Sequence, residues 1–363
     1  MSELIHANET MPERTTGQNL NTASYYLAFV TLGTAGAVLG PTLLNLAKNT
    51  GVKLGDISLL FAARSIGYLI GSVLGGRLYD RRPGHPVMSL MLIGLAVALA
   101  LMPEISLFWI LVTVVLLAGL AEGTIDVGGN TLLVWLYRHH VGPYMNGLHL
   151  FFGIGAIIAP LLIAQVIQWS GSINWAFWLL AVLPLPTALW LLRLPSPKAQ
   201  PTSVEGASGQ TDRRLVALTI LFFFLYVGVE VSFGGWVFTY AVKQNLATEA
   251  AAAYLTSAFW GAFTLGRLVS IPISLRVRPR YILLWDLIGT VIFLAILVIW
   301  PNSEMALWIG VLGVGAVDCL RLPYHYVAGG PPHECDWSDC RIIFVGASIG
   351  AKLILPWVIG YLV

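Results

Sequence analysis

The feature that most constrains this chain is a succession of apolar runs, each long enough to cross a lipid bilayer as a helix. A helix needs roughly 20 predominantly apolar residues to span the hydrocarbon core, and the runs between turn signals give about eleven such segments. Lipid offers no partner for backbone N–H and C=O groups, so these runs must be helical. The sequence therefore predicts an all-α polytopic membrane protein. The predicted spans are 24–47, 55–78, 86–103, 108–136, 146–169, 175–193, 214–242, 250–275, 280–300, 305–317 and 342–363.

Composition and charge exclude several other classes of protein. The chain is 57% hydrophobic and only 10% charged, with a mean hydropathy of +0.78, whereas soluble domains carry about 25% charged residues. A net charge of +2 without a basic cluster argues against a nucleic-acid partner. Residues 1–23 are polar and contain no cleavable signal. We expect a lipid bilayer as the solvent of this chain.

Lys and Arg are distributed unequally between the two sides of the predicted spans. They gather in the loops after even-numbered spans, and cytoplasmic loops carry such an excess. The sequence therefore predicts a cytoplasmic N-terminus, in a plasma or inner membrane. The basic residues of these loops are Arg77, Arg81, Arg82, Arg138, Arg193, Lys198, Arg213, Arg214, Arg276, Arg278 and Arg280.

An internal repeat divides the chain into two related halves. A shift of 190 residues places Gly71 on Gly261, and Arg77 on Arg267. Two such halves are typical of transporters that rock around a central site. We expect a tail at 1–23, an N-terminal six-helix bundle at 24–193, a cytoplasmic linker at 194–213 and a C-terminal bundle at 214–363. The repeat predicts a further span, equivalent to 175–193, so the C-terminal bundle has five of its six helices.

Several motifs resemble one transporter family. GGRLYDRRPG at 75–84 resembles the loop between the second and third spans of the major facilitator superfamily. ARSIGYLIGS (63–72), GTIDVGGNTLLVWL (123–136), NGLHLFFGIGA (146–156) and LYVGVEVSFGGWVFTYAV (225–242) are similar to its branch with fucose permease and the sodium-dependent glucose transporters. The resemblance covers the chain from residue 24. It implies the major facilitator fold, a monomer, and a conformational lock at the cytoplasmic ends of the helices, for which the matching residues are Arg77, Asp80, Arg81 and Arg267.

Residues 316–341 break the apolar pattern of the tenth span with a run of polar side chains, which are costly inside a membrane. One reading is a metal site, but the spacing matches no zinc pattern. The other is a shifted reading frame: one permissible back-translation of 316–343, read one nucleotide later, gives an apolar helix that rejoins FVGASIGA. Sequencing the gene distinguishes them. The ligand types in the segment are Cys319, His325, His333, Cys335 and Cys340.

Ionisable residues within spans are expensive and therefore candidates for function. Glu122, Asp126 and Asn130 stand at i, i+4 and i+8 of the fourth span, on one helical face. A carboxylate on a cavity can exchange a proton or help to bind Na⁺. In fucose permease a carboxylate on the fourth span takes part in proton coupling, and Glu122 is the nearest match; the acid on its first span has no counterpart in 24–47. Asp126 could instead form a structural lock with Arg77 or Arg138.

Other polar and aromatic side chains complete the candidate solute- and ion-binding site. Arg64 needs a partner within the membrane, either Glu122 or backbone carbonyls. Glu230 lies among glycines that allow a helix break, as at many transporter sites. Sugars are bound by polar side chains together with aromatic rings. The remaining candidates are Asn146, His149, Trp236 and Trp260.

The sequence predicts a secondary active transporter, a symporter of a small polar solute, most simply a sugar, coupled to H⁺ or Na⁺ by alternating access. It predicts no cofactor, no resident metal and no enzymatic activity, since no span holds a nucleophile–base pair or HExxH motif. The alternatives are a drug or metabolite exporter of the same superfamily and a transport-inactive truncated relic. The polar line of Glu122, Asp126 and Asn130 disfavours an exporter with an apolar cavity.

Overall fold

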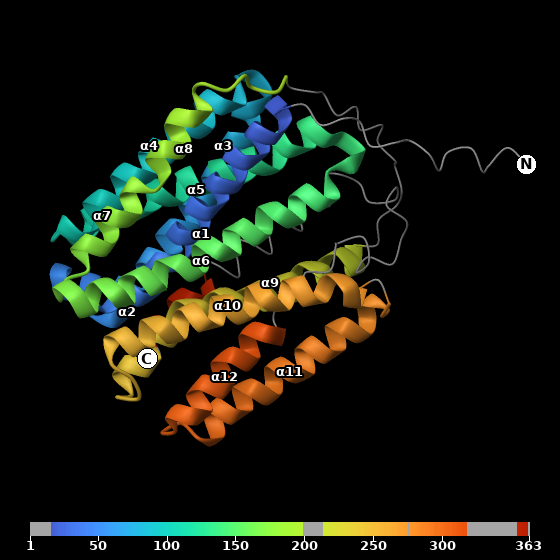
Figure 1. The fold of residues 1–363 in the computed structure, drawn as a ribbon. Coiled ribbons are helices and arrows are strands. Elements are labelled where there is room, and N and C mark those ends of the chain that lie inside the picture. Colours follow the sequence, from blue (N-terminus) through green and yellow to red (C-terminus); the bar gives the residue numbers. More distant parts are fainter. Residues whose placement is uncertain (1–15, 199–212, 275, 318–353, 362–363) are drawn as a thin grey trace, which may run out of the picture.

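The computed structural model describes residues 16–198, 213–274, 276–317 and 354–361, and these residues form helices with no strand (Figure 1). The all-α prediction is confirmed. A last helical stretch at 354–361 carries no label. The labelled elements are α1 (Thr16–Thr50), α2 (Leu54–Ile57), α3 (Leu59–Arg81), α4 (Gly84–Leu101), η1 (Met102–Glu104), α5 (Phe108–Tyr137), η2 (Arg138–His140), α6 (Gly142–Ser170), α7 (Asn174–Val182), α8 (Pro184–Leu191), α9 (Arg213–Lys243), α10 (Glu249–Ser274), α11 (Pro279–Ile299) and α12 (Glu304–Val317).

The helices follow the predicted spans closely, with three differences in their bounds. Helix α1 begins at Thr16, within the segment 1–23 that was predicted as a tail. The second span starts with the short helix α2 before α3. The sixth span is divided into α7 and α8 at Pro184, because proline cannot donate the backbone hydrogen bond that would continue the helix. Among the described residues, eight helices are long and apolar enough to cross a membrane. The total of about eleven spans stays a prediction.

The helices form two bundles that lie side by side (Figure 1). In the first bundle α3 packs against α5, α1 against α6, and α4 against α5, α7 and α8. In the second, α9 and α12 both pack against α10, and α11 packs against α12. The pairing of α10 with α12 parallels that of α3 with α5, which agrees with the sequence repeat that superimposes Gly71 of α3 on Gly261 of α10. The bundles meet where α6 contacts α10 and α1 contacts α9.

Glycines set the distance between α3 and α5. A Cβ added at Gly67 of α3 would overlap the backbone of Leu116, and one added at Gly119 of α5 would overlap the backbone carbonyl of Arg64. Only a hydrogen side chain allows such close approach of two helices, as at the small-residue interfaces of membrane proteins. The close contact fixes the register of the two helices. It places the polar side chains of α3 directly opposite those of α5.

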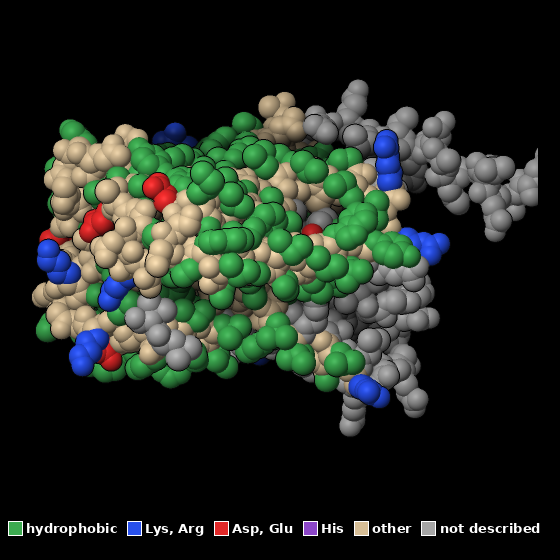
Figure 2. All heavy atoms as spheres, turned by 90° about the horizontal axis from the view of Figure 1, so that it is seen from below, with side chains coloured by type: hydrophobic (Ala, Val, Ile, Leu, Met, Phe, Trp, Pro, Cys, Tyr) green, Lys and Arg blue, Asp and Glu red, His purple; other side chains and the backbone are tan. Residues whose placement is uncertain are grey.

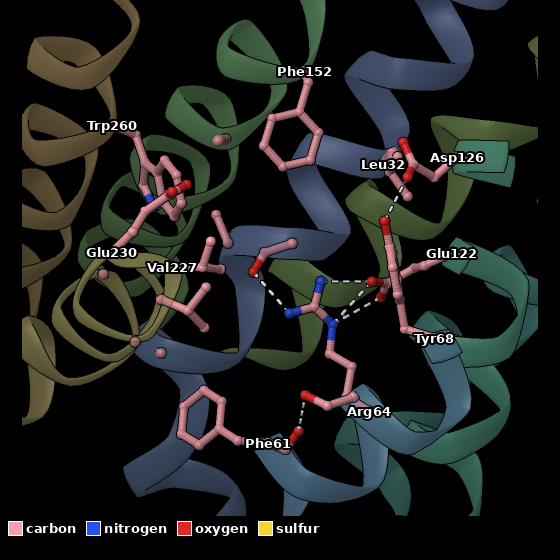
Figure 3. Close-up of a pocket in the computed structure, with 18 of the residues that line it drawn as sticks. Leu32, Phe61, Arg64, Tyr68, Glu122, Asp126, Phe152, Val227, Glu230 and Trp260 are labelled. Atoms are coloured by element: carbon pink, nitrogen blue, oxygen red, sulfur yellow. Dashed lines mark hydrogen bonds and ion pairs between the residues drawn. The ribbon is translucent and has the colours of Figure 1, made fainter. Parts of the chain in front are cut away.

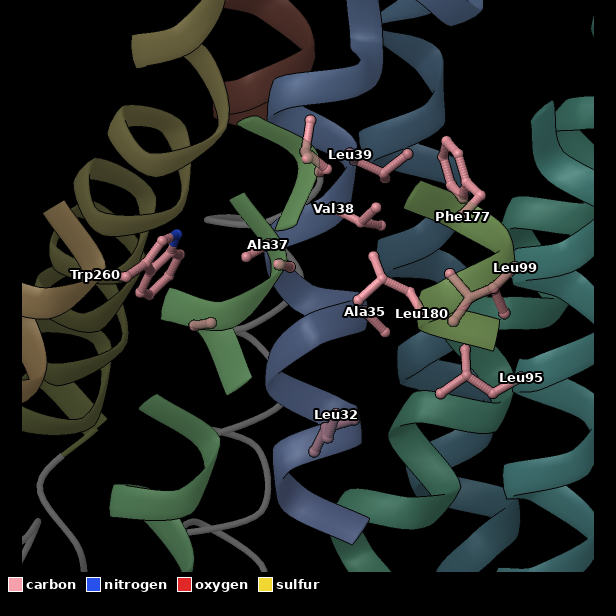
Figure 4. Close-up of a cluster of buried hydrophobic side chains, with 14 of the residues drawn as sticks. Leu32, Ala35, Ala37, Val38, Leu39, Leu95, Leu99, Phe177, Leu180 and Trp260 are labelled. Atoms are coloured by element: carbon pink, nitrogen blue, oxygen red, sulfur yellow. The ribbon is translucent and has the colours of Figure 1, made fainter. Parts of the chain in front are cut away.

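A continuous apolar core joins α1 to the outer helices of its bundle (Figure 4). Leu32 and Leu39 of α1, Leu95 and Leu99 of α4, and Phe177 of α7 are each at most 3% exposed. One face of α1 therefore packs against the outer helices of its bundle. Its other face borders the space between the two bundles.

The surface of the molecule is apolar where a soluble protein would be polar. Leucines, valines and tryptophans on α4, α5, α7 and α11 are largely exposed, among them Leu90, Trp109 and Val291. Figure 2 shows hydrophobic side chains over the middle of one face, with Lys and Arg towards both ends. Contiguous apolar surface of this extent indicates contact with another apolar medium, here lipid.

Three predicted features lie outside the described residues. The structure describes only the first two residues of segment 316–341. Both interpretations of this segment, the metal site and the shifted frame, therefore concern residues outside the described part of the chain. The greater part of the linker 194–213 and of the eleventh predicted span, 342–363, also lies outside. These expectations stay predictions.

Candidate functional site

A polar pocket lies between the two bundles, with a cavity volume of about 150 Å³. Its wall is built from α1, α3, α5 and α6 of the first bundle and from α9 and α10 of the second. The charged and aromatic side chains that line it are Phe29, Phe61, Arg64, Tyr68, Glu122, Asp126, His149, Phe152, Glu230, Trp260 and Arg267. The pocket therefore stands at the interface between the two bundles.

An ion pair between Arg64 and Glu122 forms one wall of the pocket (Figure 3). Arg64 Nε donates to Oε1 and Oε2 of Glu122 at 3.0 and 2.9 Å, and Nη2 donates to Oε2 at 2.5 Å. The other terminal nitrogen, Nη1, donates to the carbonyl of Gly36 on α1 at 3.3 Å. The Glu122 side chain is 3% exposed and that of Arg64 22%. Both partners that the sequence offered for Arg64, the acid and a backbone carbonyl, are used at once.

A second polar pair lies one helical turn along the same interface. Tyr68 donates its hydroxyl to Oδ2 of Asp126 at 2.5 Å. Asn130 donates to the backbone carbonyl of Asp126 at 2.8 Å and to its Oδ1 at 3.3 Å. Among the described residues Asp126 forms no ion pair with Arg77 or Arg138, so the lock that the sequence offered as its alternative role is not formed in this structure.

The opposite wall of the pocket comes from the second bundle and carries two polar atoms with no partner. Glu230 of α9 is 5% exposed and Trp260 of α10 is 8% exposed. Glu230 Oε2 and Trp260 Nε1 are both buried without a hydrogen-bond partner among the described residues. The two side chains lie together in Figure 3, across the pocket from Glu122. Gly234, one turn after Glu230, gives the indole room, since a Cβ there would stand 3.1 Å from Trp260 Cζ2.

Three further candidates have different surroundings. His149 lines the pocket, half-buried, with its ring edge against Phe29 at a centroid distance of 6.2 Å. Asn146 is exposed and does not line the pocket. Trp236 points away from the pocket: it is 6% exposed, and its Nε1 donates to the carbonyl of Pro356 at 2.9 Å. The geometry gives Trp236 a role in packing, in place of the solute contact that the sequence suggested.

The four predicted lock residues divide into two groups. Arg77, Asp80 and Arg81 are exposed at the end of α3 and form no ion pair among the described residues. Arg267 instead lines the pocket, with its guanidinium carbon 4.1 Å from the centroid of the Phe263 ring. The sequence repeat matched Arg267 to Arg77, but Arg267 lies deeper than a lock at the helix end would require.

Aromatic residues of the pocket were missed by sequence reasoning. Phe61 and Phe152 line it, and Phe152 lies between the two polar walls in Figure 3. Large apolar side chains are frequent in every span, so composition gives no reason to select these two. The available signal was spacing: His149, Phe152 and Ala156 recur at helical intervals and share one face of α6.

The two bundles contact each other beside the start of α3. Ser58 donates its hydroxyl to the carbonyl of Trp357 at 3.2 Å. Gly40 of α1 lies against the carbonyls of Gly234 and Gly235. Helix α1 crosses the bundle once between its N-terminus and Gly40, so these contacts lie away from the N-terminal end of α1.

The comparisons with known proteins agree with this architecture. The model of the Major Facilitator Superfamily matches residues 25–324, which ends within the aberrant segment 316–341. A Xenopus laevis protein named sodium-dependent glucose transporter 1 is 30% identical over 358 residues, covering 90% of this chain and 72% of its own length. Human major facilitator superfamily domain-containing protein 4A is 26% identical over 440 residues, covering 93% of this chain and 85% of its own.

Solved structures show the same fold at lower sequence identity. The crystal structure of a D-xylose–proton symporter superimposes with a TM-score of 0.68 at 14% identity, covering 95% of this chain and 89% of that protein. Two bundles around a central pocket are the architecture of this family of membrane transporters. The chain belongs to the Major Facilitator Superfamily, in the branch that contains the proteins named sodium-dependent glucose transporter 1. It is an integral, multi-pass membrane protein.

Proposed function

We propose that this protein is a symporter of a small polar solute of the sugar class, driven by H⁺ or Na⁺ and working by alternating access. The names of its relatives support the substrate class: one is called a sodium-dependent glucose transporter, and a protein of the same fold is a D-xylose–proton symporter. The observation that carries the proposal is the buried pair of Arg64 and Glu122 on the pocket between the bundles.

The pocket chemistry suits a polyhydroxylated solute. Each sugar hydroxyl both donates and accepts hydrogen bonds. The guanidinium of Arg64 supplies donors, the carboxylates of Glu122 and Asp126 supply acceptors, and all three groups line one wall. Where water is excluded from the pocket, an apolar analogue of the solute would leave these polar groups without hydrogen-bond partners, which is costly. The pocket should therefore bind hydroxylated solutes in preference to apolar analogues.

Aromatic rings that line the pocket suit the apolar faces of a sugar ring. Trp260 and Phe152 both line the pocket. The indole also has a donor, Nε1, that lacks a partner among the described residues and can serve a hydroxyl oxygen. The pocket thus offers aromatic rings together with fixed charged groups. A drug exporter would need a cavity with few fixed polar groups.

The proposal includes an orientation in the membrane. We place the N-terminus in the cytoplasm, so that the contact of Ser58 with Trp357 lies towards the outer side. Arg77, Asp80 and Arg81 are then at the cytoplasmic end of α3 and would lock the protein in its outward-facing state, with the transporter acting as a monomer. Protease cleavage of an N-terminal tag in inside-out but not right-side-out vesicles tests the orientation.

A thermal-shift screen tests the substrate class. The purified protein is heated with a panel of hexoses, pentoses, nucleosides and apolar drugs, each with and without Na⁺. A ligand that binds the folded state raises the melting temperature in proportion to the logarithm of its concentration over its dissociation constant. We expect a sugar to stabilise the wild type, and Arg64→Met to abolish that shift. A panel in which no sugar stabilises the wild type, while a nucleoside or an apolar drug does, would contradict the proposal.

A further inference from the structure

Two buried carboxylates face each other across the pocket in different states of pairing. Both oxygens of Glu122 accept hydrogen bonds from Arg64, and this ion pair satisfies the carboxylate. Glu230 is equally deep, at 5% exposed, but its Oε2 has no donor and the side chain forms no ion pair among the described residues. A carboxylate of this kind is neutralised by a bound cation or by donors on a ligand, since a bare buried charge is strongly unfavourable.

Among the residues that the structure describes, none forms an ion pair with Glu230. The charged or titratable groups that line the same pocket are Arg64, Glu122, Asp126, His149 and Arg267. The guanidinium of Arg64 is engaged by Glu122 and Gly36. Arg267 lines the pocket from α10 with its guanidinium over Phe263, and the ion pair found among the described residues joins Arg64 to Glu122, not Arg267 to Glu230. Helix α1, which also packs against α9, presents no acidic or basic side chain to the pocket.

We propose that Glu230 is the carboxylate that holds the coupling cation, H⁺ or Na⁺, and that the Arg64–Glu122 pair serves the solute. The assignment rests on the proposed symport. It reverses the expectation from the sequence, in which Glu122 was the candidate for coupling. The reason is the ion pair: a cation that occupied Glu122 would have to displace a guanidinium held by three hydrogen bonds.

Coupling follows from the position of Glu230 at the interface of the bundles. From the outer side, a proton taken up from water makes the carboxylate neutral, or Na⁺ binds its oxygens together with oxygens of the solute. The bundles can then close around an uncharged or compensated site. On the inner side the same cation is released to water, and the carboxylate is charged again. Closure of the bundles around the bare Glu230 carboxylate is disfavoured. The solute therefore crosses together with the cation and not without it.

The experiment uses the full-length protein in proteoliposomes, with a sugar that stabilises it in the thermal-shift screen. Two readouts are compared: uphill accumulation driven by an imposed H⁺ or Na⁺ gradient, and counterflow without a gradient. We expect Glu230→Gln to lose accumulation, and its counterflow to become independent of pH and Na⁺. Responses to pH alone identify the cation as H⁺, and responses to Na⁺ at fixed pH identify it as Na⁺.

A matched control separates this role from a general effect of a buried acid. Asp286 on α11 is likewise buried, at 4% exposed, and its Oδ2 has no hydrogen-bond partner in the described part of the chain, but it does not line the pocket. We expect Asp286→Asn to retain cation-driven accumulation. Should Glu230→Gln fail to fold, Glu230→Asp keeps the charge and withdraws it by one methylene. That variant should raise the half-saturating cation concentration without a matching change for the sugar.

The outcomes separate the assignment from the function on which it rests. Gradient-driven accumulation by Glu230→Gln at the wild-type level overturns the assignment and leaves symport standing. Loss of accumulation in Glu122→Gln, with counterflow retained but independent of pH and Na⁺, would return the coupling role to Glu122. A wild type that shows counterflow of sugar but no response to either gradient overturns both the coupling and the assignment.

Discussion

The Arg64–Glu122 pair gives the most quantitative prediction of the structure. Arg64→Met removes every hydrogen bond that the structure shows to the Glu122 carboxylate, which is 3% exposed. Removing one partner of a buried ion pair costs about 3–5 kcal/mol, because the other charge is left bare. Glu122→Leu should cost less, towards about 3 kcal/mol, since Arg64 is 22% exposed and keeps the carbonyl of Gly36.

The double variant separates the pair from its surroundings. Arg64→Met combined with Glu122→Leu replaces both charges by apolar groups, an exchange that is often neutral or stabilising. We expect its free energy of unfolding to lie within about 1 kcal/mol of the wild type, so the two single effects are far from additive. The variant should nevertheless bind no sugar. The double variant is thus predicted to keep the stability of the wild type and to lose transport.

The assay is a double-mutant cycle on purified protein in detergent micelles. Unfolding free energies of the wild type, both single variants and the double variant are measured alongside sugar binding. Additive losses, with the double variant less stable than either single one, would show that the two side chains do not interact as the structure has them. A double variant that binds sugar like the wild type would refute the binding role of the pair.

Three further substitutions test other parts of the structure. Gly67→Val should prevent the close contact of α3 with α5, and overpacking of this kind costs about 1–3 kcal/mol or more; size-exclusion chromatography should show less folded protein. Tyr68→Phe removes the hydroxyl that donates to Asp126, and a lost hydrogen bond to a charged group should lower the free energy of unfolding by about 1.5–3 kcal/mol. Trp260→Phe keeps a ring but loses Nε1, so it should weaken sugar binding less than Trp260→Ala does, as measured by isothermal titration calorimetry.

Much of the fold could be predicted because membrane helices obey a simple length rule. Apolar runs of the required length located the helices, and Pro184 was the local cause of the break inside the sixth predicted span. The pairing of Arg64 with Glu122 was also open to prediction, since a charge in a span needs a partner and few acids are available. Both arguments concern single residues, a proline within a helix and a charge within a membrane span, and lipid tolerates few residues of these kinds.

The remainder of the site depends on how each helix is rotated about its axis. In a soluble helix the apolar face shows which side points inwards, but α3, α5 and α9 are apolar on nearly all sides. The sequence could not show that Trp236 turns to Pro356 while Trp260 turns to the pocket. It also could not place Arg267 beside the pocket, since the repeat only matched it to Arg77.

Counterflow of a sugar in proteoliposomes tests the central claim most directly. Vesicles that contain the purified protein are loaded with an excess of unlabelled glucose and diluted into buffer with a trace of labelled glucose. A carrier with a sugar site in its central pocket predicts a transient overshoot of label inside the vesicles, absent from vesicles with the Arg64→Met, Glu122→Leu double variant. Labelled sugar that never rises above its level in protein-free vesicles, for glucose and for every other sugar in the panel, would contradict the account.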